Sequence, residues 1–205
     1  RFYVKEFEAD TNLRCCLVLD TSGSMDFGSG DITKLQYARK IAGALSYLAV
    51  QQGDAIGLSC VAENMIQNIP PRRNPAHLMQ TIRQRALIVI ISDFFVEPAE
   101  LRSCFEHLQF RKHDVTAFHL LDPQELGFEF RRPMRFLDME GGPAIFAEPN
   151  EIADRYHKAL QEYLENLKQV VLQTGIDYHR TVIDEDYEKV LTQFLAGRTR
   201  ARGVR

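Results

Sequence analysis

The sequence predicts a Rossmann-like, three-layer α/β/α fold around a mostly parallel sheet. Two nearly continuous apolar runs, at 13–20 (LRCCLVLD) and 86–93 (ALIVIISD), are typical of strands that are buried on both faces. Between the strand-like runs lie segments whose apolar residues recur at spacings of three and four, as on one side of a helix. Alternation of strands and helices favours parallel pairing with right-handed crossovers, and therefore helices on both faces of the sheet.

The other elements follow from the same periodicities. Further strands are expected at 54–62, 65–70, 113–122 and 176–183. Helices are expected from a cap at Asp31 or Thr33 to Gly53, from Asn74 and Pro75, from Pro98, from a cap at Asn150 to Gly175, and over 185–197. Residues 127–146 contain short aromatic segments split by proline and glycine, which we expect to form short strands or loops at the end of the sheet.

Length and composition predict one soluble domain over residues 1–205. The net charge of −3 creates no global attraction to nucleic acid or to an anionic membrane. No apolar run approaches the ~20 residues that span a bilayer, and the charged start suggests a chain cut from a longer one. Four cysteines without a C-x-x-C pair favour a reduced, cytoplasmic protein with buried thiols.

Three aspartates end three of the predicted strands. Asp20 follows the first apolar run, Asp93 ends the run at 86–93, and Asp122 ends the next strand. In parallel sheets ligands bind outside the carboxyl ends of the strands, so these side chains are expected at one edge. A carboxylate at the end of a buried strand is costly unless it is compensated, and no lysine lies near Asp20 or Asp93 in the sequence.

The residues after the first strand have a spacing that suits a hard cation. Asp20, Ser22 and Ser24 offer one carboxylate and two hydroxyls, which favour Mg²⁺ or Mn²⁺ over zinc. Because Mg²⁺ keeps waters readily, Asp93 is expected to bind through a water, and Gly23 is expected to let the backbone fold close to the ion. An ordinary turn or helix cap is the alternative for these residues.

The segment LVLDTSGSM resembles the D-x-S-x-S signature that opens the metal-ion-dependent adhesion site (MIDAS) of von Willebrand A domains. Together with KLQYARKIAGALSYLAVQQGDAIGL, ALIVIISDFF and HDVTAFHLLDPQELGF, it resembles the bacterial family called domain of unknown function 58, from about Phe2 to Arg198. The resemblance implies a von Willebrand A-like fold, with Asp20, Ser22 and Ser24 as direct ligands and Asp93 as a ligand through water. It also implies a MoxR-type AAA ATPase as partner, and the family's biochemical activity is not established.

The chain departs from that pattern between the third and fourth expected strands. The family's site takes a threonine from a G-T loop, and nothing here matches it, since Thr81 has no preceding glycine. A helix from Pro75 also leaves almost no residues for a turn before Ala86, where connections usually take about 2–6 residues. We therefore predict that a segment is missing between His77 and Arg85.

The function predicted from these features is protein binding and not catalysis. A vacant coordination position on the cation would accept a carboxylate from a partner protein. The segment DPQEL, with Asp122 and Glu125, is a further candidate for partner binding, although a turn held by Pro123 is the simpler interpretation. The alternatives are a metal-dependent hydrolase of phosphate esters, with Asp20 as nucleophile or ligand, and a structural role without an ion.

Overall fold

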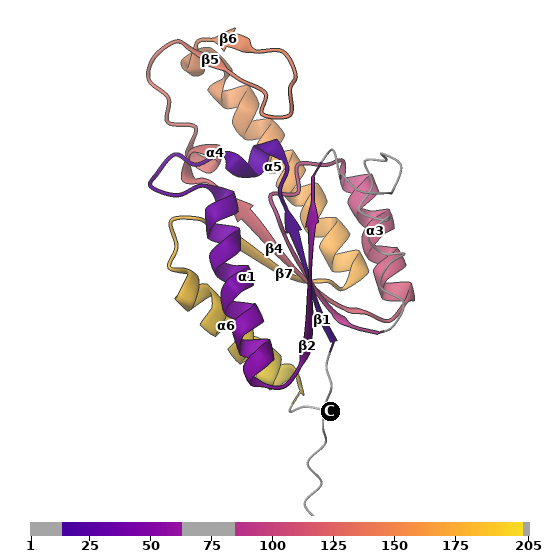
Figure 1. Cartoon of the computed structure of the whole chain (residues 1–205). Helices are drawn as coiled ribbons and strands as arrows, with labels where there is room; N and C mark the ends of the chain where they lie inside the picture. Colours follow the sequence, from indigo (N-terminus) through magenta and orange to yellow (C-terminus); the bar gives the residue numbers. More distant parts are fainter. Residues whose placement is uncertain (1–13, 63–84, 203–205) are drawn as a thin grey trace, which may run out of the picture.

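The computed structural model describes residues 14–62 and 85–202, with side chains described as far as Arg198 (Figure 1). Within these ranges five strands form one sheet in the order β2-β1-β3-β4-β7, and every neighbouring pair is parallel. The strands are β1 (Arg14–Asp20), β2 (Ala55–Val61), β3 (Leu87–Ser92), β4 (Asp114–Leu121) and β7 (Asp177–Val182). The strand expected at 65–70, the helix expected near Pro75 and the missing segment predicted between 77 and 85 lie outside the described residues.

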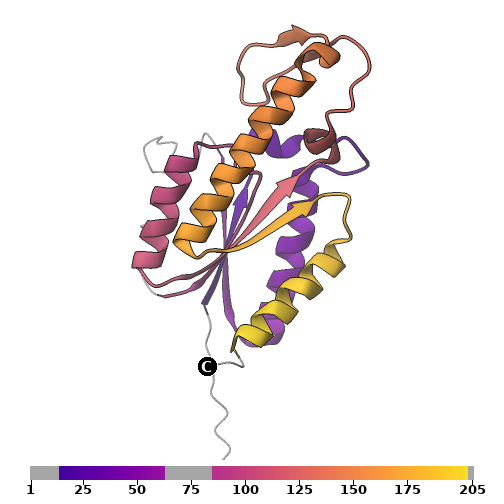
Figure 2. The same ribbon diagram turned by 180° about the vertical axis from the view of Figure 1, so that it is seen from behind.

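Helices cover both faces of the sheet, which confirms the predicted three-layer α/β/α fold. Figures 1 and 2 show α1 (Lys34–Gln51) and α6 (Tyr187–Arg202) on one face, and α3 (Pro98–Phe110) and α5 (Pro149–Thr174) on the other. Alternate residues of β1 serve the two cores, because successive side chains of a strand point to opposite faces. Leu17 packs in the core under α1 and α6, and Val18 packs in the core under α3 and α5.

The two apolar runs that indicated buried strands lie at the centre of the sheet. All six residues of β3 are buried, and β1 is buried at four of its seven positions. Leu19 of β1 pairs in register with Ile91 of β3, so the two strands reach the same edge together. This register places the residues that follow β1 and β3 side by side, where the candidate site was expected.

The helix ends mostly follow the predicted capping residues. Thr33 caps α1 in a reciprocal capping box with Gln36, and Gly175 ends α5 in the left-handed conformation, with φ 61°. The prediction that Asn150 caps α5 is wrong, because the helix begins at Pro149 and Glu148 occupies the cap position. Proline suits the first turn of a helix, where its missing N–H would have no partner.

A small accessory layer lies beyond the carboxyl ends of the strands. It contains the 3₁₀ helix η1 (Gly23–Asp26), the short helix α4 (Pro123–Gly127) and an antiparallel ribbon of β5 (Met134–Phe136) and β6 (Ile145–Ala147), as Figure 1 shows. The first turns of α5 extend into this layer, where the Tyr156 ring stacks on Phe128 with a centroid distance of 4.3 Å. The aromatic segments between 127 and 146 therefore form the expected short strands and loops.

Candidate functional site

Asp20 ends β1 at the carboxyl edge and is held by two donors. The Ser22 backbone N–H donates to Asp20 Oδ1 at 2.9 Å, and the Ser92 hydroxyl donates to Oδ2 at 2.5 Å. Burial raises the pKa of the Asp20 carboxyl above its ordinary value, the nearby Asp93 charge raises it further, and the hydrogen bonds from Ser92 and Ser22 oppose the rise. Because β1 and β3 are neighbouring parallel strands, Asp20 and Asp93 lie at the same edge of the sheet.

The loop after Asp20 brings two serine hydroxyls together. Ser22 Oγ and Ser24 Oγ are 3.2 Å apart, and both residues are half-buried. The fully buried side chain of Met25 anchors the end of this loop, and Thr21 anchors its start through two hydrogen bonds to the Val61 carbonyl. Neighbouring ligands in an octahedral Mg²⁺ site lie about 3.0 Å apart, since each is about 2.1 Å from the ion. The two hydroxyls thus have a spacing that fits a cation.

Asp93 has a partner that sequence analysis missed. Lys34, at the first position of α1, places Nζ 2.8 Å from Asp93 Oδ2, and the Lys34 side chain has no exposed surface. No lysine lies near Asp93 in the sequence, but the fold brings Lys34 of α1 over the end of β3, where its ammonium group compensates the carboxylate. Lys34 shares the helical stripe of the buried residues Ala38 and Ile41, and this spacing was a signal for its burial.

The same ammonium group connects Asp93 to Glu125. Lys34 Nζ is 2.5 Å from Glu125 Oε1, and Glu125 Oε2 accepts the backbone N–H of Asp122 at 2.7 Å. Burial raises the pKa of Glu125, and the charge of Lys34 opposes the rise. The Tyr156 hydroxyl also donates to the Glu125 carbonyl at 2.7 Å, so the network extends to α5. Lys34 is therefore the positive centre of a buried network of two carboxylates.

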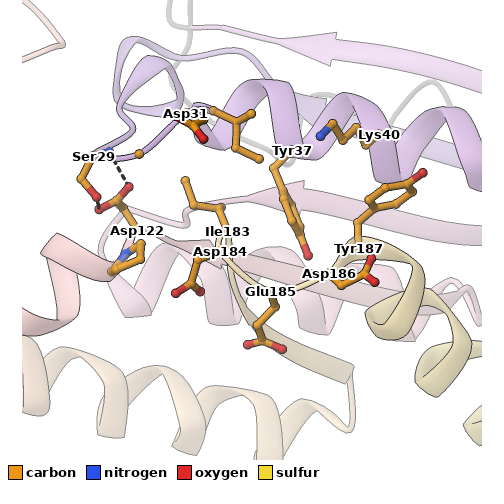
Figure 3. Close-up of a pocket in the computed structure, with 13 residues that line it drawn as sticks. Ser29, Asp31, Tyr37, Lys40, Asp122, Ile183, Asp184, Glu185, Asp186 and Tyr187 are labelled. Atoms are coloured by element: carbon orange, nitrogen blue, oxygen red, sulfur yellow. Dashed lines mark hydrogen bonds between the residues drawn. The ribbon is translucent and has the colours of Figure 1, made fainter.

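Asp122, which sequence analysis named with Glu125 as a weak partner-binding candidate, makes internal contacts. Its Oδ2 accepts the Ser29 backbone N–H at 2.7 Å and its Oδ1 accepts the Ser29 hydroxyl at 2.5 Å, both drawn in Figure 3. It also caps α4, where Gln124 N–H donates to Oδ1 at 2.7 Å. This geometry corresponds to the simpler interpretation of DPQEL as a turn. Asp122 ties the loop after η1 to the end of β4.

Sequence analysis also missed an acidic residue at the site, Glu140. Glu140 lies in the turn between β5 and β6, and its Oε1 accepts the Ser24 backbone N–H at 2.7 Å. The residues are 116 positions apart in the chain, and no periodicity of the sequence connects them. Glu140 therefore brings a carboxylate from the ribbon to the loop that carries Ser22 and Ser24.

The acidic, histidine and cysteine side chains of the described residues form no ready-made metal cluster. Among residues 14–62 and 85–198, no group of three or more His, Cys, Asp or Glu side chains is arranged to hold a metal ion. A cation at Asp20 would depend on hydroxyl ligands instead. In the described part of the chain, no helix has the length and apolar character needed to cross a membrane.

Comparisons with known proteins agree with one part of the resemblance, the similarity to domain of unknown function 58. A family model described as "Protein of unknown function DUF58" matches residues 1–84. Uncharacterized proteins of Mycobacterium tuberculosis (Rv1480) and Mycobacterium bovis (Mb1516) are each 23% identical over 227 residues, which cover 97% of this chain and 71% of theirs. These relatives are bacterial, and their names assign no activity.

Two solved structures are similar in fold. The conserved hypothetical protein BatB from Bacteroides thetaiotaomicron has a TM-score of 0.55 and 14% identity, and covers 92% of this chain and 99% of its own. An aerotolerance-related membrane protein from Bacteroides fragilis has a TM-score of 0.50 and 16% identity, and covers 88% of this chain and 96% of its own. At this identity the likeness shows the fold.

Proposed function

We propose that the carboxyl edge of the sheet is a MIDAS-type site, where the chain binds a partner protein through Mg²⁺ or Mn²⁺. The observation that carries this proposal is the 3.2 Å separation of the Ser22 and Ser24 hydroxyls beside the half-buried carboxylate of Asp20. These are oxygen ligands only, of the kind that hard cations prefer. The resemblance to the von Willebrand A signature supports the same assignment.

Asp20, Ser22 and Ser24 would hold the cation, and each of them is positioned before the ion arrives. Ser92 and the Ser22 backbone N–H orient the Asp20 carboxylate, so it loses little freedom on binding. The bound cation supplies a positive charge and an open coordination position for a partner's carboxylate. A MoxR-type AAA ATPase is the partner that the family resemblance suggests.

In this proposal Asp93 contributes less to the cation site than the sequence suggested, because Lys34 takes one of its carboxylate oxygens. Its Oδ2 is paired with Lys34, and its Oδ1 makes one long hydrogen bond, 3.4 Å from the Phe95 backbone nitrogen. Only Oδ1 is therefore available to a water on the cation. Asp93 would act mainly by its charge, which already raises the pKa of Asp20.

A structural role without an ion has one observation in its favour. Lys34 neutralises part of the charge of Asp93 and Glu125, so those two carboxylates do not require a dication. In that alternative Ser92 and Ser22 are the partners that hold Asp20 among the described residues. The two functions differ in a measurable way, because only the proposed site binds Mg²⁺ or Mn²⁺ at Asp20.

The proposal is tested by isothermal titration of Mg²⁺ and Mn²⁺ into the wild-type chain, Asp20→Ala and Asp26→Ala. Asp26 is an exposed acid in the same loop and serves as the matched control. Loss of an outer-shell partner typically weakens metal binding 10–100-fold, so loss of Asp20 is expected to weaken it at least ~10-fold. Asp26→Ala is expected to bind like the wild type.

Binding of a purified MoxR-type ATPase is then measured with and without EDTA. We expect the wild-type complex to require the cation and Asp20→Ala to lose the complex in either condition. Cation binding that is unchanged in Asp20→Ala would overturn the site, and a complex that is indifferent to EDTA would overturn its role in binding. Metal-stimulated hydrolysis of a phosphate ester that Asp20→Ala abolishes would instead favour an enzyme.

A further inference from the structure

The turn between β5 and β6 packs directly on the proposed cation loop. Glu140 accepts the Ser24 backbone N–H, as described above, and the Met139 carbonyl lies against Gly23. A Cβ atom placed on Gly23 would come within 2.1 Å of the Met139 carbonyl oxygen, so only glycine permits this approach. The structure therefore requires glycine at position 23 because the backbone of the turn fills the space that a side chain would occupy, and not because an ion lies nearby.

The turn is built to present Glu140 in this position. The Glu140 backbone N–H donates to Asp138 Oδ1 at 2.9 Å, and Gly141 closes the turn with a φ of 88° and a hydrogen bond to the Asp138 carbonyl. A turn held by its own hydrogen bonds keeps its shape when it leaves the loop. Glu140 is therefore a preorganised carboxylate beside Ser24, which is one of the proposed ligands.

The contact between turn and loop is polar, and little apolar surface secures it. Met139 remains 47% exposed, and its neighbour Leu137 is 65% exposed. Segments with few buried apolar contacts open at low free-energy cost. The ribbon is anchored at Phe136, the last residue of β5 before the turn, which stacks on Phe128 with a centroid distance of 5.8 Å. The turn is thus able to leave the loop while Phe136 keeps the end of β5 attached.

We propose that Glu140 is an internal acidic ligand of the cation site, which occupies the place of a partner's carboxylate until the partner displaces it. This inference rests on the proposed function. It adds a fourth oxygen donor that the D-x-S-x-S motif does not contain, and it makes the turn 138–141 an autoinhibitory contact. The partner chemistry that fits is an exposed Asp or Glu side chain, since that group replaces Glu140 without a change of charge.

The test uses Mn²⁺ with the wild-type chain, Glu140→Ala, Gly23→Ala and the control Glu162→Gln. Glu162 is an exposed acid on α5. Titration gives the Mn²⁺ affinity, and water-proton relaxation reports the number of waters on the bound ion. Glu140→Ala is expected to weaken Mn²⁺ binding about 10-fold and to raise the relaxation enhancement, because water replaces the lost carboxylate. Glu162→Gln is expected to change neither quantity.

Gly23→Ala provides a second variant, which retains Glu140 but pushes the turn away from the loop. Hydrogen exchange at the Ser24 amide is expected to accelerate in Gly23→Ala and in Glu140→Ala, because both lose the same hydrogen bond. Soluble N-acetyl-glutamate methylamide, a model of a partner's side chain, is expected to bind the Mn²⁺-loaded Glu140→Ala chain at least ~10-fold more tightly than the wild type, since its competitor is gone.

The possible failures are distinguishable. Should the wild type bind no Mn²⁺, the proposed function fails and the inference falls with it. Should the wild type bind Mn²⁺ through Asp20 while Glu140→Ala shows the same affinity and the same relaxation, the cation site stands and Glu140 has no part in it. Equal affinity of the wild type and Glu140→Ala for the model ligand would exclude competition by Glu140.

Discussion

Replacement of Lys34 by methionine is expected to destabilise the fold by about 3–5 kcal/mol at neutral pH, the cost of breaking a buried ion pair from one side. The Lys34 side chain is fully buried, and its partners Asp93 and Glu125 have side chains only 2% and 13% exposed. At 2.8 Å and an effective dielectric constant of about 20, one such pair interacts by roughly 6 kcal/mol before desolvation is subtracted. Methionine keeps most of the volume but leaves two carboxylates without their cation.

The loss depends on pH in a defined direction. The charge of Lys34 lowers the pKa of Glu125, so its removal raises that pKa further above the ordinary value. A carboxyl whose folded-state pKa is raised contributes stability at low pH, and that contribution is lost as the pH rises through the folded-state value. The difference between Lys34→Met and the wild type is therefore expected to be small in acid and to grow toward neutral pH.

Urea denaturation followed by circular dichroism measures this difference. Lys158→Met, at an exposed lysine of α5, is the matched control and is expected to change the free energy of unfolding by less than about 0.5 kcal/mol. Saturating Mg²⁺, at 100 times its dissociation constant, would add about 2.7 kcal/mol to any variant that binds it. If Lys34→Met lowers the free energy of unfolding by less than about 1 kcal/mol at pH 7, the reasoning is refuted, because an exposed ion pair on the surface already contributes up to about 1 kcal/mol.

Two further predictions concern pH. Because burial raises the pKa of Asp20 above its ordinary 3.8, Mg²⁺ affinity is expected to begin falling at a higher pH than for an exposed aspartate, and titration calorimetry in several buffers should detect proton release on binding. Burial lowers the pKa of His119 from 6.5 to about 4, so the unfolded chain binds more protons between these values. The free energy of unfolding is therefore expected to drop by about 3 kcal/mol as the pH falls through this range. His119→Gln should remove this drop. His107→Gln, a control at an exposed histidine, should retain it.

The fold was predictable because its signals are local and repeated. β3 is a continuous run of apolar residues because it is buried on both faces, and α1 has an apolar stripe because one side packs on the sheet. The end of α5 was predicted correctly from Gly175, since a left-handed cap strongly favours glycine. Its start was misplaced by two residues, since the predicted cap was Asn150 and the observed cap is Glu148. Proline at the first helical position and a polar residue after it give overlapping signals.

The candidate site was only partly predictable, and its two missed residues differ in kind. Lys34 lies on the buried stripe of α1. The helical periodicity places it on the side that faces the sheet, but a lysine is not normally expected at a buried position. Glu140 reaches the Ser24 loop from a turn 116 residues away. That contact depends on how the β5–β6 ribbon folds over the edge of the sheet. Side chains that converge through tertiary structure have no fixed spacing in the sequence.

The charges at this edge connect the two missed residues to the proposed cation. Lys34 is bonded to Asp93 and Glu125, while Asp20 and Glu140 are held by serine hydroxyl and backbone N–H donors. Counted together with Lys34, these four carboxylates leave a formal excess of three negative charges at this edge, and a dication would reduce that excess to one. Exchange of Glu140 for a partner's acid leaves that charge unchanged. Selection of a partner would then depend on contacts outside the cation site, and Ile145 and Phe146 of β6 offer exposed apolar side chains for such contacts.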